Sequence, residues 1–256
     1  MSFDISQVLN QWPYQPGEIQ VRRCKGRDGK EKVQLRVDLG VLQMNVEGRP
    51  DGKRPFGHES LMEHYQARLK RSLEPREGKP REFTLSAENC AKLHQEAIQY
   101  YHRYICLFQL NDFDGVIRDT ERNLRLIDFV NEHAQSEDFG SVLQQFKPQL
   151  LWMNIRAKGA LALEDKRYGD AIELIQRGVE SIRAFYRRHT SNEAMEQSGE
   201  IQFLESWLKE IQAQRPLSEK EKLEHALNEA VGREDYEKAA EVRDALRNLD
   251  QSSSNQ

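Results

Sequence analysis

The stretch that decides the fold is SEKEKLEHALNEAVGREDYEKAAEVRDALRNL, residues 218–249. Ser218 followed three residues later by Glu221 is a capping box, which predicts that a helix begins there. Apolar residues then recur at helical spacing in two runs, which the turn residues 232–235 separate. The sequence therefore predicts an antiparallel helical hairpin over 218–250. Its two apolar sets are Leu223, Leu227, Ala230 and Val231, and then Tyr236, Ala239, Ala240, Leu246 and Leu249.

A hairpin of this size has too little apolar surface to be stable alone. Ordering about thirty residues costs roughly 45 kcal/mol, at ~1.5 kcal/mol per residue. Offsetting that cost needs on the order of 1,800 Å² of apolar burial at ~25 cal/mol per Å², which a seam rich in alanine does not provide. We therefore expect the hairpin to dock on the rest of the chain, on a second copy or on a partner protein.

The same residues resemble a known motif. Ala230-Val231, Asp235-Tyr236-Glu237, Ala239-Ala240 and Val242-Arg243-Asp244, with Leu246 and Leu249, look like the UVR motif shared by the bacterial excinuclease subunits UvrB and UvrC. They are also similar to its copies in Clp-type ATPase subunits and in the activator of the bacterial protein-arginine kinase. Glu234 departs from the pattern, since an apolar residue is usual there, and Gly232 weakens the end of the first helix. The resemblance implies a helical hairpin that pairs with another such hairpin or with a partner protein.

The apolar seam and the charged pair beside it form the candidate partner-binding set. Arg243 lies seven residues after Tyr236, so helical periodicity places it along the seam. Either its head pairs with a carboxylate such as Glu229 within the hairpin, or Arg243 and Asp244 pair across an intermolecular interface. The candidate partner-binding residues are Leu223, Leu227, Val231, Tyr236, Ala239, Ala240, Arg243, Asp244 and Leu246.

Composition indicates a polar-surfaced chain without a membrane span. Among its 256 residues 38% are hydrophobic and 31% charged, and the net charge is -4. No apolar run approaches the ~18 residues of a transmembrane helix, and the N-terminus lacks the pattern of a secretory signal. The three cysteines, at positions 24, 90 and 106, form no CxxC pair. A reducing, cytoplasmic location is therefore expected.

The apolar period changes along the chain and predicts an α+β fold that is mostly α. Alternating residues over 18–47 predict a small antiparallel β meander within an N-terminal α+β module, 1–73. Helical spacing returns after a Pro- and Gly-containing linker, 74–83, and predicts a helical-hairpin bundle over 84–215. The terminal hairpin, 218–250, is followed by a tail, 251–256, which we expect to be disordered.

The bundle has a weak resemblance to tetratricopeptide-type repeats. Gly159, Tyr168 and Ala171 match that pattern, whereas the preceding helix pair keeps only Phe113. Since Phe113 and Tyr168 are 55 positions apart and the usual repeat is ~34 residues, we expect repeat-like helical hairpins and no regular array.

The loop GRPDGKRPFGH, residues 48–58, contains three glycines and two prolines, which exclude regular structure there. Its cations Arg49, Lys53 and Arg54 are a possible anion-binding set. The alternative is a solvated crossover to a helix that begins near Glu59. An enzymatic role would need polar groups to converge around Arg49, Asp51 and His58.

A nucleic-acid-associated role, linked to excision repair, is the second hypothesis for function. Lys and Arg outnumber Asp and Glu by five over residues 18–82, a mild excess without any accompanying nucleic-acid-binding motif. This hypothesis requires six cations to gather on one surface. They are Arg22, Arg23, Lys25, Arg36, Lys53 and Arg54.

No catalytic residue, metal site or cofactor is predicted. Walker-type, zinc-protease and nucleophile motifs are absent. Cys90, His94, His102 and Cys106 are spaced along one predicted helix, whose rise of 1.5 Å per residue separates the outer two by about 24 Å, too far for one metal ion. The leading hypothesis is a bacterial, non-enzymatic adaptor that binds a protein partner or itself through the terminal hairpin.

Overall fold

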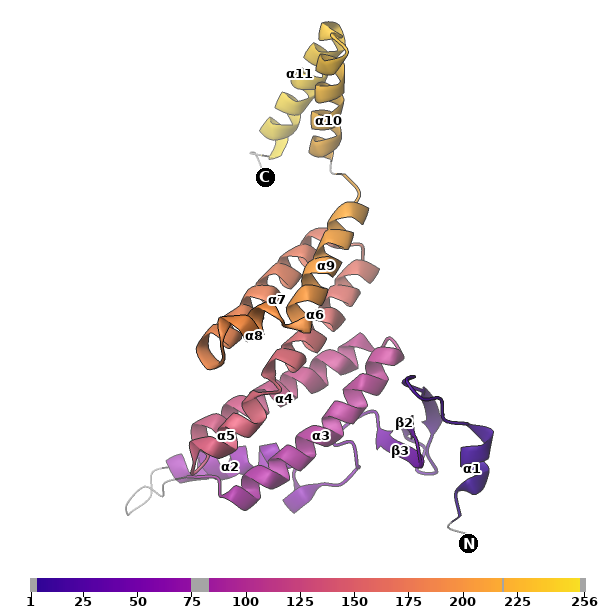
Figure 1. The fold of residues 1–256 in the computed structure, drawn as a ribbon, viewed down its shortest axis with the longest axis vertical. Coiled ribbons are helices and arrows are strands. Elements are labelled where there is room, and N and C mark those ends of the chain that lie inside the picture. Colours follow the sequence, from indigo (N-terminus) through magenta and orange to yellow (C-terminus); the bar gives the residue numbers. More distant parts are fainter. Residues whose placement is uncertain (1–3, 75–82, 218, 254–256) are drawn as a thin grey trace. The chain divides into compact units, whose positions relative to one another are not determined.

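The computed structural model describes residues 4–74, 83–217 and 219–253 (Figure 1). The chain forms two compact units, one that ends at Leu208 and one that begins at Lys209. A three-stranded antiparallel sheet lies near the N-terminus, helices make up most of the rest, and a helical hairpin stands at the C-terminal end. The predicted fold class, α+β and mostly α, is confirmed.

The N-terminal sheet is the predicted β meander. A short helix, α1 (Ser6–Gln11), precedes the strands β1 (Val21–Lys25), β2 (Glu31–Val37) and β3 (Gly40–Asn45), which lie in the order β1-β2-β3. The central strand pairs Val33 with Arg23 on one side and with Met44 on the other. Val33 is fully buried, so this face of the sheet joins the core.

The 48–58 loop contains one short regular element that the sequence analysis excluded. Its residues Pro55–Gly57 form a turn of 3-10 helix, η1. Proline supplies the fixed φ of a first helical position, and Phe56 adopts the left-handed conformation at φ +51°. Helix α2 (Leu61–Leu73) begins directly after Ser60, whose hydroxyl accepts a hydrogen bond from Glu63 N.

In the described residues, seven further helices lie between α2 and the terminal hairpin. Ser86 caps the first of them, and Pro148 lies in the first turn of α6. The short helices α5 and α8 were not predicted. The bounds are α3 (Ala87–Gln109), α4 (Phe113–His133), α5 (Glu137–Gln144), α6 (Lys147–Glu164), α7 (Tyr168–His189), α8 (Asn192–Glu196) and α9 (Gly199–Gln214).

One hydrophobic core joins the sheet to helices α2 to α6. Val33 and Met44 from the strands belong to the same cluster as Leu107 and Leu126 from α3 and α4. Leu85, also fully buried, ties the segment before α3 to the end of α4 through backbone hydrogen bonds to 133 and 135. The predicted linker, 74–83, thus falls inside the first unit, and its residues 75–82 lie outside the described part of the chain.

The terminal hairpin consists of α10 (Glu219–Gly232) and α11 (Tyr236–Ser253). Helix α11 continues through 251–253, where the sequence predicted the start of a disordered tail, and 254–256 lie outside the description. The predicted capping residue Ser218 does as well. In the described residues no helix is both long and apolar enough to cross a membrane.

Candidate functional site

The two helices of the terminal hairpin pack through small side chains. Ala230 of α10 is 4% exposed and Ala239 of α11 is 8% exposed, whereas Leu223, Leu227 and Leu246 are only half-buried. Alanine contacts let the helices approach closely but bury little apolar area. The hairpin is therefore held by a narrow seam, and larger apolar side chains beside it remain accessible.

Backbone hydrogen bonds close the turn of the hairpin. The one that links the residues farthest apart in the sequence runs from Asp235 N to Ala230 O at 2.9 Å. Glu234 occupies the left-handed conformation, φ +60°, at a cost of roughly 1–2 kcal/mol for a residue with a side chain. Asp235 then caps α11 by accepting a hydrogen bond from Lys238 N at 3.1 Å. The left-handed position thus falls on Glu234, two residues beyond Gly232.

The same turn occurs twice in the first unit. Asn111 between α3 and α4 has φ +55°, and Lys166 between α6 and α7 has φ +58°. In each of these turns a backbone hydrogen bond again links two residues that are five positions apart in the sequence. An aromatic residue begins the second helix each time. The bonds run from Asp112 N to Leu107 O at 2.9 Å and from Arg167 N to Ala162 O at 2.7 Å, and the aromatic residues are Phe113, Tyr168 and, in the terminal hairpin, Tyr236.

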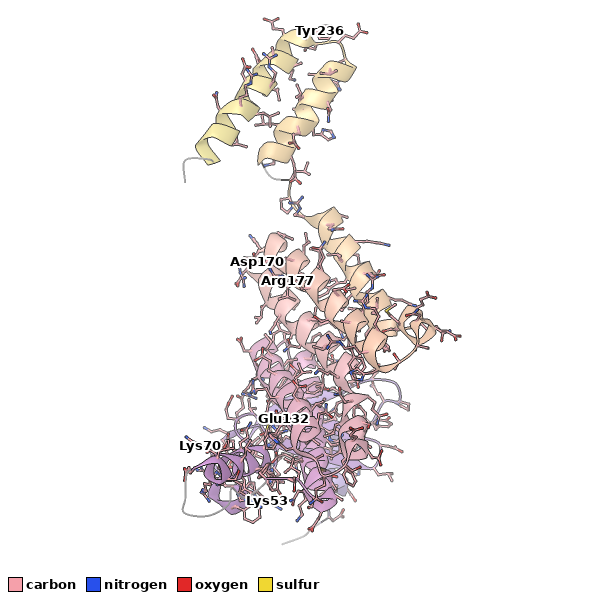
Figure 2. The ribbon with its side chains drawn as sticks, turned by 90° about the vertical axis from the view of Figure 1, so that its left-hand side faces the viewer. Lys53, Lys70, Glu132, Asp170, Arg177 and Tyr236 are labelled. Atoms are coloured by element: carbon pink, nitrogen blue, oxygen red, sulfur yellow. The ribbon has the colours of Figure 1, made fainter. Side chains whose placement is uncertain are left out.

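These equivalent aromatic residues differ in exposure. Phe113 is 8% exposed and makes an edge contact of 5.6 Å between ring centres with Phe108. Arg156 of α6 in turn lies 4.4 Å from the centre of the Phe108 ring, so a third helix covers the α3–α4 hairpin beside its turn. Tyr236, labelled at the tip of the hairpin in Figure 2, is 69% exposed.

Tyr236 belongs to one continuous face of the hairpin, which we call the tyrosine face. By the helical period, Leu227 and Val231 lie on one side of the seam residue Ala230 in α10. Tyr236, Ala240 and Arg243 lie on the corresponding side of Ala239 in α11. In antiparallel helices these two flanks coincide on one side of the pair. Val231 is 52% exposed, so the face combines accessible apolar side chains with a guanidinium. The opposite face carries Lys222, Glu229, Lys238 and Glu241.

Arg243 does not pair with Glu229, the partner that the sequence analysis considered within the hairpin. Its Nη2 lies 3.2 Å from Asp244 Oδ1, while Glu229 pairs with Arg233 at 2.6 Å. The side chains of Arg243 and Asp244 are 58% and 61% exposed, and an exposed pair of this kind stabilises a fold by little. Both charges remain accessible on the surface.

Arg247 belongs to the tyrosine face as well, although it is not among the partner-binding residues predicted from the sequence. It lies one helical turn after Arg243 and is exposed. Helical spacing counted from Tyr236 was the signal that could have identified it.

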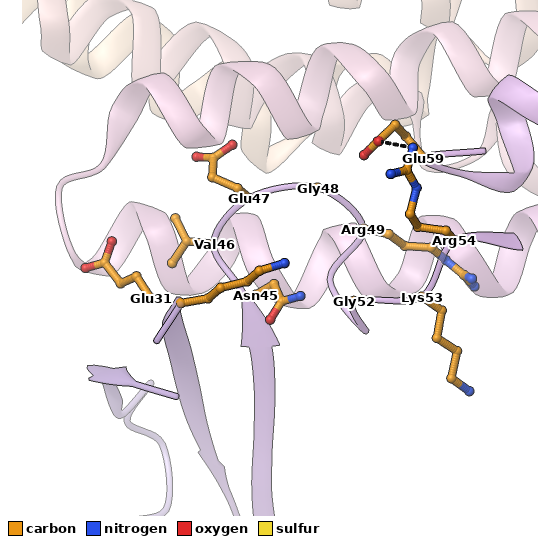
Figure 3. A pocket seen from close by; sticks show the side chains of 11 residues that line it. Glu31, Asn45, Val46, Glu47, Gly48, Arg49, Gly52, Lys53, Arg54 and Glu59 are labelled. Atoms are coloured by element: carbon orange, nitrogen blue, oxygen red, sulfur yellow. Dashed lines mark ion pairs between the residues drawn. The ribbon is translucent and has the colours of Figure 1, made fainter. Parts of the chain in front are cut away.

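Two of the three predicted anion-binding cations of the 48–58 loop pair with carboxylates, and Figure 3 shows the pair of Arg54 with Glu59. Arg49 Nε lies 3.0 Å from Glu96 Oε1, and the Arg49 side chain is only 12% exposed. Arg54 pairs with Glu59 at 2.6 Å. Lys53 is exposed beside a cavity of about 560 Å³ whose lining also includes Glu31, Glu47 and Glu59. The lining mixes both signs of charge, so this loop forms no concentrated positive site.

Glu96 of α3 links the 48–58 loop to α4 and to the start of α2 through ion pairs and hydrogen bonds. Glu96 accepts hydrogen bonds from Leu61 N and Met62 N at the start of α2, and it pairs with Arg122 as well as with Arg49. Burial lowers the pKa of the Arg122 guanidinium, and the carboxylate beside it offsets this effect. The charges of this region therefore position the loop and α2.

The six cations required by the nucleic-acid hypothesis do not gather on one open surface. Arg36 is buried, and its guanidinium donates to the backbone oxygens of Trp12, Asp38 and Gly40. Arg23 pairs with Glu31 at 2.9 Å and with Asp112 at 2.7 Å. Arg22 donates to Gln34 and stacks on Trp12, and Arg54 pairs with Glu59. Structural contacts thus occupy four of these six side chains.

No group of potential metal ligands was found within the described ranges. Cys90 and Cys106 are buried, and burial raises the pKa of the Cys106 thiol to about 12. Cys106 is therefore a protonated, apolar side chain at neutral pH. Of the residues in the enzymatic alternative, His58 makes an edge contact with His64 at 5.3 Å, and Arg49 lies 3.5 Å from Asp51.

Comparison with known families supports the assignment of the hairpin. The UVR family, described as UvrB/uvrC motif, matches residues 218–252, which are α10 and most of α11. Searches of curated proteins and of solved structures each give no match. The resemblance noted from the sequence is confirmed, and it concerns the terminal hairpin.

Proposed function

We propose that this chain is an adaptor that binds a protein partner through the tyrosine face of its terminal hairpin. The observation that carries the proposal is the 69% exposure of Tyr236, compared with the 8% exposure of Phe113 after the same kind of turn. In the α3–α4 hairpin, α6 covers the aromatic residues beside the turn. A helix supplied by another molecule would give Tyr236 and Val231 the equivalent cover.

The kind of partner follows from the chemistry of the tyrosine face. Leu227, Val231 and Tyr236 offer apolar contacts, and Arg243 and Arg247 lie along one edge of that face. An amphipathic helix with an apolar stripe and flanking carboxylates would complement it. That helix belongs to a second copy or to another protein, as the UVR motif implies, and the proposal assigns no catalytic step to the chain.

A cytoplasmic setting in bacteria is part of the proposal. Cys24, Cys90 and Cys106 are all free thiols, as is common in a reducing compartment. The UVR motif supports the bacterial setting, because the excinuclease subunits UvrB and UvrC that share it are bacterial.

The experiment compares the full chain with a chain that ends at Pro216. Light scattering measures the mass, and a pull-down from bacterial lysate followed by titration with each captured protein measures partner binding. We expect the truncation to abolish dimerisation or the binding of specific partners. An unchanged oligomeric state together with unchanged partners would contradict the proposal.

Point variants test whether the tyrosine face carries the binding. Tyr236→Lys and Val231→Lys place a charge within its apolar part and should weaken binding at least tenfold, equivalent to about 1.4 kcal/mol. Glu241→Lys introduces the same side chain on the opposite face of α11 and should leave binding nearly unchanged. Equal effects of all three variants would show that the hairpin binds through another surface.

A further inference from the structure

A second concave site lies in the first unit, away from the hairpin and the 48–58 loop. Residues of α3, α4, α5 and α6 line a cavity of about 370 Å³ that is open to solvent on one side, within the roughly 300–1,000 Å³ range of small-molecule sites. Its apolar wall includes Ile98, Ile127, Leu143 and Leu150. No Asp, Glu, Lys or Arg lines it, so the lining offers no counter-charge to an ionised ligand.

Tyr104 supplies a phenolic hydroxyl to the lining of this cavity. Its side chain is 2% exposed, yet its hydroxyl hydrogen-bonds to no residue in the described part of the chain. Tyr65, which is buried to a similar degree, donates its hydroxyl to Asn89 Oδ1 at 2.7 Å. The hydroxyl is not one of the fully enclosed polar atoms that lack a partner, so it keeps accessible surface and is available to a molecule inside the cavity that Tyr104 lines.

Aromatic rings, two histidines and the amide side chains of Asn123 and Gln149 complete the lining. Tyr101 makes an edge contact with Tyr104 at 5.5 Å between ring centres, and His94 lies against Phe146 at 6.0 Å. Burial lowers the pKa of His102, so its imidazole is neutral at pH 7. Aromatic faces and edges of this kind favour a planar, unsaturated ring.

We propose that the cavity between α3, α4, α5 and α6 binds a small, uncharged aromatic molecule that hydrogen-bonds to the Tyr104 hydroxyl. The shape and the apolar wall select the ring, and the absence of charged lining residues disfavours carboxylates and amines. The site is separate from the tyrosine face, and ligand binding there does not depend on the adaptor function.

The test uses the full chain and three probes that share one ring system. These are 2-naphthol, naphthalene and 2-naphthoate, titrated at pH 7.5 with ligand fluorescence as the readout. We expect 2-naphthol to bind at least tenfold more tightly than 2-naphthoate and severalfold more tightly than naphthalene. Failure of 2-naphthol to bind, or equal affinity for 2-naphthoate, would overturn the proposal.

Tyr104→Phe removes the hydroxyl and keeps the ring. In this variant the preference for 2-naphthol over naphthalene should disappear, while naphthalene binds as before. Tyr100→Phe is the matched control, because Tyr100 is also buried in α3 but does not line the cavity. If Tyr104→Phe keeps the preference, or if Tyr100→Phe removes it equally, the assignment of Tyr104 is wrong.

Discussion

Arginine side chains hold much of the first unit together, and their partners decide what each one does. Arg103 and Asp119 are both fully buried and share two hydrogen bonds, 2.6 and 2.7 Å long. The remaining nitrogen of Arg103 donates to the backbone oxygens of Asn45 and Gly48 at 3.0 and 2.7 Å. One side chain of α3 thus links α4 to the end of β3 and to the start of the 48–58 loop.

Arg103→Leu should destabilise the chain by about 3–5 kcal/mol, because Asp119 would keep a buried charge with less compensation. The free energy of unfolding in urea measures the effect. Arg125→Leu is the matched control, since Arg125 is 63% exposed and lies 4.0 Å from Glu121. Its replacement should cost less than about 1 kcal/mol, and similar losses in both variants would refute the structural role of Arg103.

At the scale of elements, close approaches between helices depend on glycine at particular positions. A Cβ atom added to Gly159 of α6 would lie 2.5 Å from the ring of Trp207 in α9. Gly178 of α7 is similarly close to Ile155 of α6. Gly169, near the start of α7, has no such neighbour within 4 Å, so its role is not set by packing.

Replacement by alanine at two of these glycines should therefore change the stability of the chain in opposite directions. Gly159→Ala forces Trp207 to move and should lower stability by about 1–2 kcal/mol, even though alanine favours the helix by ~1 kcal/mol. The Cβ atom added by Gly169→Ala has no neighbour within 4 Å, so this variant should raise stability by up to about 1 kcal/mol. Thermal unfolding followed by circular dichroism measures both, and a stabilising Gly159→Ala would contradict the described packing of α6 and α9.

At the scale of the whole molecule, the two units differ in how much they bury. The first has a continuous core of large apolar residues from the sheet and helices α2 to α6. In the described hairpin only Ala230 and Ala239 fall in the buried class. A seam this small does not offset the roughly 45 kcal/mol of ordering free energy expected for about thirty residues, so association should stabilise the hairpin.

A chain that ends at Pro216 should retain the cooperative unfolding of the first unit, because its core residues all precede that point. The full chain should show an additional helical transition whose midpoint rises with protein or partner concentration. Circular dichroism melts at two concentrations test both statements. A midpoint that is independent of concentration, without or with partner, would show that association does not stabilise the hairpin.

Local patterns in the sequence were sufficient for most of the elements and for the motif. The spacing of Leu223, Leu227, Tyr236 and Ala239 predicted the hairpin, because helix formation depends on residues three to four positions apart. Alternation around Val33 likewise predicted the meander, since side chains in a strand alternate between its two faces. The short helices α5 and α8 were missed, because a helix of so few residues has little periodicity to read.

Tertiary structure decided which predicted functional residues are accessible. Arg49 reads as an anion ligand in the sequence, but it pairs with Glu96, whose buried position no local pattern reveals. Tyr236 and Phe113 follow the same local turn, yet one is exposed and the other covered. Accessibility and charge pairing depend on side chains brought together from distant parts of the chain, whereas helices and turns depend on near neighbours. The sequence by itself therefore determined the elements and the UVR motif, and the tertiary structure decided the tyrosine face and the cavity at Tyr104.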